Sequence, residues 1–121
     1  MCPKKRRNTV SYPLTPYQRL ALWSSVDLLR FVKGGSAPTF SIQTIESVCY
    51  TFELSDGDNN TYEFEFTASH HRVCSYALKY ALLYLSGEFH YFDLPIPERI
   101  DSEIKEFEPY IRFLAVQFKA N

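Results

Sequence analysis

The hydrophobic pattern that follows residue 14 predicts a long helix. Thr15 is a suitable N-cap, Pro16 suits the first turn, and Gln18 occupies the capping-box position. The pattern ends at a Gly-Gly pair at positions 34–35. Its apolar residues are Tyr17, Leu20, Ala21, Leu22, Trp23, Val26, Leu29 and Val32. An apolar surface this wide predicts a helix that is enclosed in the core or that meets a partner.

Two later segments alternate apolar and polar residues, which is the period of a half-buried strand. The first segment is "VCYTFEL" (48–54) and the second is "YEFEFT" (62–67). The link between them, "SDGDNN", is longer than a two-residue turn. We therefore expect a loose hairpin with Gly57 at a positive φ.

Helical periodicity returns in the second half of the chain. An apolar stripe at helical spacing predicts a helix that stops at Gly87, and a further helical region begins at Pro97. Pro109 lies inside that region, so we expect a kink or two short helices there. Between the two regions, "FHYFDLP" (89–95) is short, aromatic and bounded by proline, which predicts a third strand. The stripe consists of Val73, Tyr76, Ala77, Tyr80, Ala81 and Tyr84.

The predicted order is helix, strand, strand, helix, strand, helix. This order predicts an α+β fold in which a small antiparallel sheet of about three strands is packed by helices. A chain of 121 residues suits one domain. We expect residues 1–14 to be a flexible basic arm, because they are polar and lack a helical or strand period. Residues 15–121 would then form the single domain.

Charge is distributed unevenly along the chain. The net charge is -1, but four basic residues stand together in the arm, and no acidic residue precedes Asp27. The rest of the chain is acidic, which argues against nucleic acid as the main ligand. The cluster is typical of a nuclear localisation signal, of an electrostatic contact with nucleic acid, or of a solvated tail. Its residues are Lys4, Lys5, Arg6 and Arg7.

The cysteines indicate a reducing compartment. There are three of them, Cys2, Cys49 and Cys74, and their spacing suggests no disulfide framework. No segment resembles a signal peptide, and no apolar run approaches the ~18 residues that a membrane span needs. We therefore expect a nuclear or cytoplasmic protein.

The densest group of reactive side chains is "HHRVC", which contains His70, His71 and Cys74. Cys49 and His90 could join it in space, but a zinc site needs four ligands, usually in close pairs, and the second pair is missing. A catalytic thiolate needs a positioned base, and no known motif surrounds Cys74. We favour histidines at a helix start and a buried thiol, with no metal.

The loop "SDGDNN" has oxygen ligands at alternate positions, as calcium loops do. Asp56, Asp58 and Asn60 alternate, but the closing Glu at the twelfth position is missing, and Glu65 falls at the tenth. The chain also lacks GxGxxG, P-loop and GxSxG motifs. We therefore predict no cofactor and no enzymatic activity.

Three consecutive stretches resemble proteins of the BTB/POZ fold, such as elongin C and the Skp-type adaptors of cullin ubiquitin ligases. "TFELSDGDNNTYEFEF" resembles their opening hairpin, and "ASHHRVCSYALKYALLYLSG" resembles the helical segment that follows. "FHYFDLPIPERIDSEIKEFEPYIRFL" resembles the next short strand and the helix that packs back on the sheet. The resemblance covers about residues 46–115 and is one of pattern and element order. It implies protein–protein interaction, through self-assembly or adaptor binding.

The leading functional hypothesis is a non-catalytic protein–protein interaction module, with self-association into a homo-oligomer or binding of a protein partner. Aromatic residues tend to anchor interfaces. The candidate contact residues on the first helix are Tyr17, Leu20, Trp23 and Phe31.

The alternative is a nuclear accessory protein that associates with nucleic acid, of the kind that viruses or mobile elements encode. It would use the basic arm, and exposed aromatic residues of the sheet could stack on bases. A third hypothesis, a small enzyme or metal protein that uses His70, His71 and Cys74, has the least support.

Overall fold

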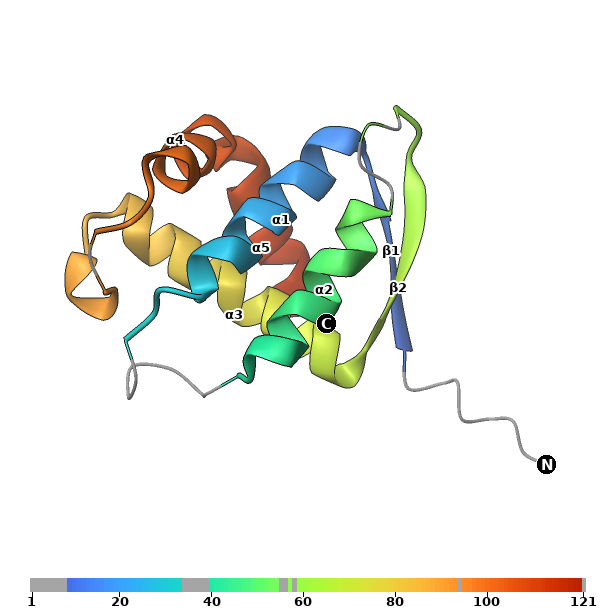
Figure 1. The fold of residues 1–121 in the computed structure, drawn as a ribbon. Helices are drawn as coiled ribbons and strands as arrows, with labels where there is room; N and C mark the ends of the chain where they lie inside the picture. The colour runs from blue at the N-terminus through green and yellow to red at the C-terminus, as the bar shows by residue number, and fades with distance from the viewer. Residues whose placement is uncertain (1–8, 34–39, 55–56, 58, 94, 121) are drawn as a thin grey trace.

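The computed structural model describes residues 9–33, 40–54, 57, 59–93 and 95–120 (Figure 1). In these ranges the chain is α+β, with five α-helices, one 3-10 helix and a two-stranded antiparallel sheet. The elements in chain order are β1 (Thr9–Leu14), α1 (Pro16–Leu29), α2 (Ile42–Glu53), β2 (Tyr62–Thr67), α3 (Ala68–Leu85), η2 (Phe89–Tyr91), α4 (Glu98–Glu106) and α5 (Glu108–Ala120).

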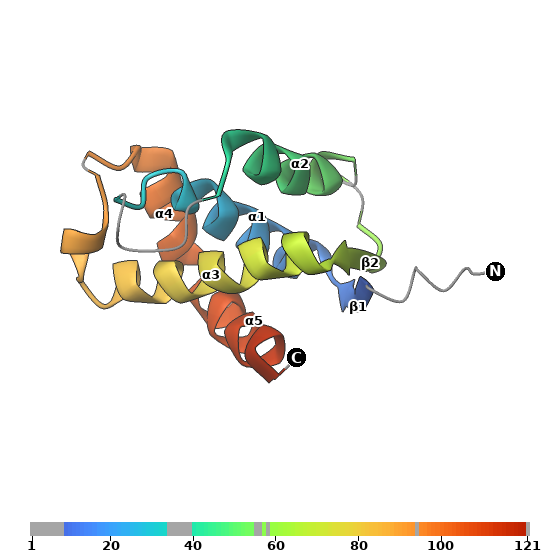
Figure 2. The ribbon, with the colours of Figure 1, turned by 90° about the horizontal axis from the view of Figure 1, so that it is seen from below.

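Helices α1 and α3 form the centre of the fold, because each of them contacts all four of the other α-helices (Figure 2). Thr15 caps α1 through the predicted capping box: the Thr15 hydroxyl accepts from the Gln18 backbone N–H, and the Gln18 side chain accepts from the Thr15 N–H. Ala21, Leu22 and Val26 have no solvent exposure. Of the two predicted alternatives, enclosure in the core therefore holds for these residues, and contact with a partner stays a prediction.

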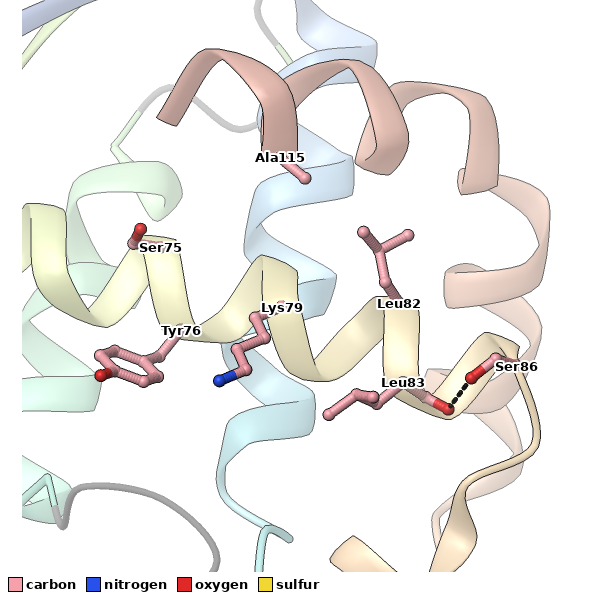
Figure 3. Close-up of a pocket in the computed structure, with 7 residues that line it drawn as sticks. All are labelled: Ser75, Tyr76, Lys79, Leu82, Leu83, Ser86 and Ala115. Carbon is pink, nitrogen blue, oxygen red and sulfur yellow. Dashed lines mark hydrogen bonds between the residues drawn. The ribbon is translucent and has the colours of Figure 1, made fainter. Parts of the chain in front are cut away.

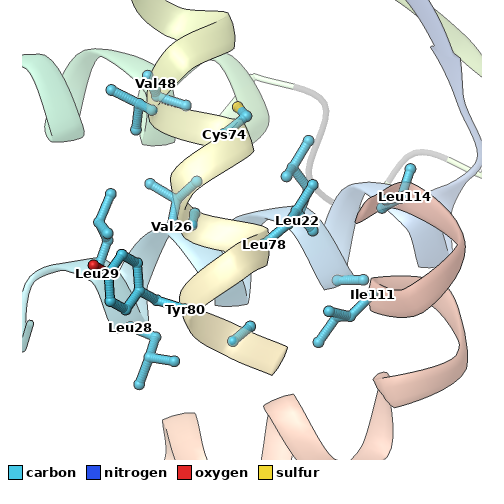
Figure 4. Close-up of a cluster of buried hydrophobic side chains, with 14 of the residues drawn as sticks. Leu22, Val26, Leu28, Leu29, Val48, Cys74, Leu78, Tyr80, Ile111 and Leu114 are labelled. Carbon is cyan, nitrogen blue, oxygen red and sulfur yellow. The ribbon is translucent and has the colours of Figure 1, made fainter. Parts of the chain in front are cut away.

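Side chains from all five α-helices and the sheet meet in one hydrophobic core. Figure 4 shows part of it, with side chains from α1, α2, α3 and α5. Burial of each large aliphatic side chain stabilises the fold by about 1.5–3 kcal/mol. Fully buried members of this core from α1, α2, α3 and α5 include Leu22, Val26, Val48, Leu78, Ile111 and Leu114.

The first strand of the predicted hairpin is wrong, because residues 48–53 belong to α2. Ser41 caps this helix by accepting a hydrogen bond from the Thr44 N–H. The buried residues Ile45, Val48, Cys49 and Phe52 have helical spacing. In a strand, Tyr50 and Phe52 would share a face, yet Tyr50 is 58% exposed and Phe52 is buried. The BTB/POZ resemblance began with this hairpin, so segment 51–66 gives it no support.

The partner of β2 is β1, which lies in the segment predicted to be a flexible arm. The two strands are antiparallel, with Tyr12 opposite Phe64 and Val10 opposite Phe66. Pro13 lacks a backbone N–H, which a strand at the edge of a sheet tolerates. The prediction of an arm is therefore wrong for residues 9–14, and residues 1–8 lie outside the described ranges. Gly57, in the loop before β2, has the predicted positive φ, at 85°.

The predictions for the second half were mostly correct. Helix α3 spans the predicted stripe. The helical region is divided in two just before Pro109, which lies in the first turn of α5, since α4 ends at Glu106 and α5 begins at Glu108. The predicted third strand is wrong: residues 89–91 are η2, and the segment keeps one isolated β-bridge between Val32 and Phe92. Three residues of 3-10 helix leave too little extended chain there for a strand.

Arg19 connects α1 to the sheet and to the loop before β2. It is a buried residue, and its Nη1 donates to the backbone oxygens of Leu14 at 3.2 Å and of Asn60 at 2.6 Å. Its guanidinium also lies over the Tyr62 ring, 5.2 Å from the centroid. One side chain therefore holds the end of β1 and the approach to β2 against α1.

Arg19→Ala should lower the free energy of unfolding by about 2–3 kcal/mol, because it leaves two carbonyl oxygens without their donor. Arg112→Ala is the control. Arg112 is exposed and pairs with Glu108 at 2.7 Å, so its loss should cost about 0.5 kcal/mol. Urea unfolding followed by circular dichroism measures both values. Equal losses would show that Arg19 does not join these segments.

A small aromatic cluster joins β1, α3 and α5. A hydrogen bond of 2.9 Å links the Tyr12 hydroxyl to Nε2 of His71. Both rings stack on Phe118, with centroid separations of 4.1 Å for Tyr12 and 5.2 Å for His71. Burial lowers the pKa of His71 below its ordinary value of 6.5.

The lowered pKa of His71 should make stability depend on pH. Unfolding lets His71 take up a proton more readily, so its contribution is complete above pH 6.5 and is lost as the pH falls through the folded-state pKa. We expect the melting temperature to fall between about pH 7 and about pH 5. The fall should be smaller in His71→Gln and unchanged in His90→Gln. Identical pH profiles for wild type and His71→Gln would contradict this assignment.

Candidate functional site

The structure brings two of the four predicted contact residues into one groove. Leu20, which is 36% exposed, and the half-buried Trp23 line it together. Tyr17, which is 58% exposed, lies beside Phe107, another lining residue, at a ring distance of 6.5 Å. Phe31 lies beyond the end of α1, where its backbone oxygen accepts a hydrogen bond from the Asp93 N–H, and it does not line the groove.

This cavity, which we call the α1 groove, lies between α1, α2 and α4 and has a volume of about 530 Å³. Its apolar end is formed by Leu20, Trp23 and Phe107. An exposed aromatic pair extends that end, because the rings of Tyr17 and Tyr110 stack 5.7 Å apart. A partner would therefore meet aromatic and aliphatic side chains at one end of the groove.

The other end of the α1 groove holds a network of ion pairs across three helices. Arg30 of α1's C-terminal cap lies 3.4 Å from Asp27 and 3.7 Å from Glu46 of α2. Arg99 of α4 lies 4.0 Å from Asp27 and 3.2 Å from Glu103. These pairs fix the walls of the groove relative to one another.

The α1 groove carries an excess of negative charge. Four carboxylates and two guanidinium groups line it. Glu103 is engaged by Arg99 and also accepts from the Ser24 hydroxyl at 3.1 Å. Glu53 and Glu106 form no ion pair within the described ranges, so their charge is available to a ligand.

The thiol of Cys49 also lies in this groove. Its Sγ accepts from Nη2 of Arg30 at 3.4 Å and donates to Oδ1 of Asp27 at 3.8 Å. Burial, reinforced by the Asp27 carboxylate, raises the pKa of Cys49 to about 11. Burial likewise raises the pKa of Cys74, which has no solvent exposure. At neutral pH both groups are thiols, which are weak nucleophiles.

In the folded protein, Cys49 and Cys74 should therefore resist alkylation by iodoacetamide at neutral pH, and both should react quickly in urea. Mass spectrometry of digested protein gives the extent of modification at each cysteine. Asp27→Asn removes one cause of the raised pKa of Cys49 and should make that thiol react faster than in wild type. Rapid labelling of Cys49 in the native protein would contradict the raised pKa.

The other residues singled out from the sequence do not converge. His71 bonds to Tyr12, His70 bonds through Nε2 to the Ser47 hydroxyl at 3.2 Å, and Cys74 is buried. Within the described ranges, no group of three or more His, Cys, Asp or Glu side chains could hold a metal ion. The candidate calcium ligands Asp56 and Asp58 lie outside those ranges.

The basic cluster also lies outside the described residues, so the structure places none of its side chains: Lys4, Lys5, Arg6 and Arg7. Among the helices that the structure does describe, none has the length and apolar character needed to cross a membrane. Comparisons with protein-family models, with curated proteins and with solved structures found no match.

Proposed function

We propose that this protein is a non-catalytic protein–protein interaction module that binds a partner segment in the α1 groove. The observation that carries the proposal is the continuity of exposed Tyr17 and Leu20 with the acid-lined groove beside α1. This surface fits a segment that carries large apolar side chains together with Lys or Arg. It belongs to a helix at the centre of the core, so it is formed before the partner arrives.

The apolar end supports binding because Leu20 and the neighbouring Tyr17 are exposed there and the aromatic side chains are held in place. Tyr17 is fixed by stacking on Tyr110, and Trp23 by stacking on Phe52 at 6.4 Å. Covering such residues removes apolar area from water at a small cost in side-chain entropy. Tyrosine and tryptophan are also the residue types that most often dominate interface energetics.

The charged end supports the choice of partner. Arg30 and Arg99, the two arginines that line the groove, are already paired with carboxylates. Glu53 and Glu106 form no ion pair with any described residue. Lys or Arg side chains of a basic partner would form ion pairs with these two carboxylates, and an acidic partner would be repelled. Electrostatic complementarity of this kind sets specificity and association rate more than affinity.

The chemistry of the groove supports a non-catalytic role. The raised pKa of Cys49 keeps its sulfur protonated at neutral pH, so it supplies no ready nucleophile. The two described cysteines are free thiols. We place the protein in a reducing nuclear or cytoplasmic compartment, where such thiols persist.

Selection of a displayed random-peptide library on the immobilised protein tests the proposal. We expect enrichment of peptides that combine Lys or Arg with Leu, Phe or Trp. Their binding should change the fluorescence of Trp23, which lines the groove and is the only tryptophan in the chain. Tyr17→Ala or Leu20→Ala should weaken binding by about fivefold or more.

Tyr50→Ala is the matched control, because Tyr50 has the same exposure as Tyr17, 58%, but does not line the α1 groove. It should leave peptide affinity unchanged. The proposal fails if selection enriches no such peptides, or if the enriched peptides bind the Tyr17→Ala and Leu20→Ala variants as tightly as wild type.

A further inference from the structure

A second cavity lies over α3 and α5. We call it the α3–α5 groove, and its volume is about 710 Å³. Leu82, Leu83 and Ala115 give it an apolar lining, and Tyr76 and Lys79 stand beside them (Figure 3). The lining of this groove thus combines aliphatic side chains with an aromatic ring and an ammonium group.

The cations of this face are held by aromatic rings. The Lys79 ammonium lies 5.6 Å from the centroid of Tyr76, and the Arg72 guanidinium lies 5.8 Å from the same ring. Neither cation pairs with a carboxylate among the residues that the structure describes. In a chain whose net charge is negative, this face is basic and open to an acidic ligand.

Helix α2 presents a surface of the complementary kind. Ile42, Glu46 and Tyr50 follow one another at four-residue spacing, so they form a single ridge. Ile42 is 54% exposed, Tyr50 is 58% exposed, and the side chain of Glu46 is 62% exposed. In Figure 2, α2 lies at the outer edge of the helices, and α5 lies on the far side of α1 and α3. We call these three residues the α2 ridge.

We infer that the α2 ridge of one copy of this chain docks in the α3–α5 groove of a second copy. An amphipathic helix that lays its apolar side chains in a hydrophobic groove is a common recognition mode, with contacts spaced as on this ridge. Ile42 and Tyr50 would cover the aliphatic lining, and Glu46 would meet Lys79. The opposite charges of Glu46 and Lys79, together with apolar side chains on both surfaces, make a second copy the occupant.

The contact joins two different surfaces, so it is heterologous. Each copy that docks still offers a free ridge or a free groove, and assemblies therefore grow with concentration or close into a ring. None of the residues that line the α1 groove takes part in this contact, although Glu46 also pairs with Arg30 of that groove at 3.7 Å. Self-association and peptide binding can for that reason succeed or fail separately.

Sedimentation velocity over a wide range of protein concentration tests the inference. Wild type should show mass increasing with concentration, and more so at low salt, because the contact includes opposite charges. Lys79→Glu, Glu46→Lys and Tyr50→Ala should each weaken association by about tenfold or more. All three positions are exposed, and circular dichroism melting checks that the variants fold.

An equimolar mixture of Lys79→Glu and Glu46→Lys provides the decisive control. In the mixture, the intact groove of one variant meets the intact ridge of the other, so association should return towards the wild-type level. Tyr17→Ala should self-associate like wild type, whereas Tyr50→Ala should retain peptide binding in the α1 groove. This reciprocal pair separates failure of the inference from failure of the proposed function.

A wild-type protein that stays monomeric at the highest concentration would overturn the inference. Association that survives Lys79→Glu and Tyr50→Ala would do the same. Salt-dependent binding of a single-stranded oligonucleotide that is lost in Lys79→Glu, without self-association of wild type, would assign the face to nucleic acid instead.

Discussion

Enclosure of α1 by the other four α-helices is the constraint on which the rest of the structure depends. Leu22 and Val26 are fully buried, and residues from every other helix join the same core. Arg19 of this helix also holds the sheet in place, because it donates hydrogen bonds to the carbonyls of Leu14 and Asn60. The strip of α1 that stays outside, including Tyr17 and Leu20, is therefore held by the most buried element of the fold.

The fold was predictable from the sequence where one signal dominated. The capping box at Thr15, the stripe of α3 and the break at Pro109 act locally, and all three predictions were confirmed. Residues 48–54 carried two periods at once, since their alternation coexists with a helical spacing that begins upstream at Ile45. Residues 9–14 alternate polar and apolar side chains as a strand does. Pro13 and the basic neighbours nevertheless favoured an arm, and the partner of this edge strand lies about fifty residues away.

The candidate site was predictable only in its apolar part. Exposure on a crowded helix could be inferred for Tyr17 and Leu20 from the width of the apolar surface. In the charged part, only the pairs within one helix, Asp27 with Arg30 and Arg99 with Glu103, have a spacing that the sequence shows. The contacts between helices join residues that are distant in sequence, such as Asp27 with Arg99 and Ser24 with Glu103. Only the packing of α4 against α1 brings them into one groove.

Residue-resolved hydrogen exchange tests most directly the claim that α1 is the fixed centre that carries a preformed surface. The amides in the middle of α1, around Leu22 and Val26, should exchange only through global unfolding. Those of the two-stranded sheet should exchange faster, through local opening. Exchange of the α1 amides as fast as that of β1 would show that α1 opens independently, and the account of a preformed groove would then be wrong.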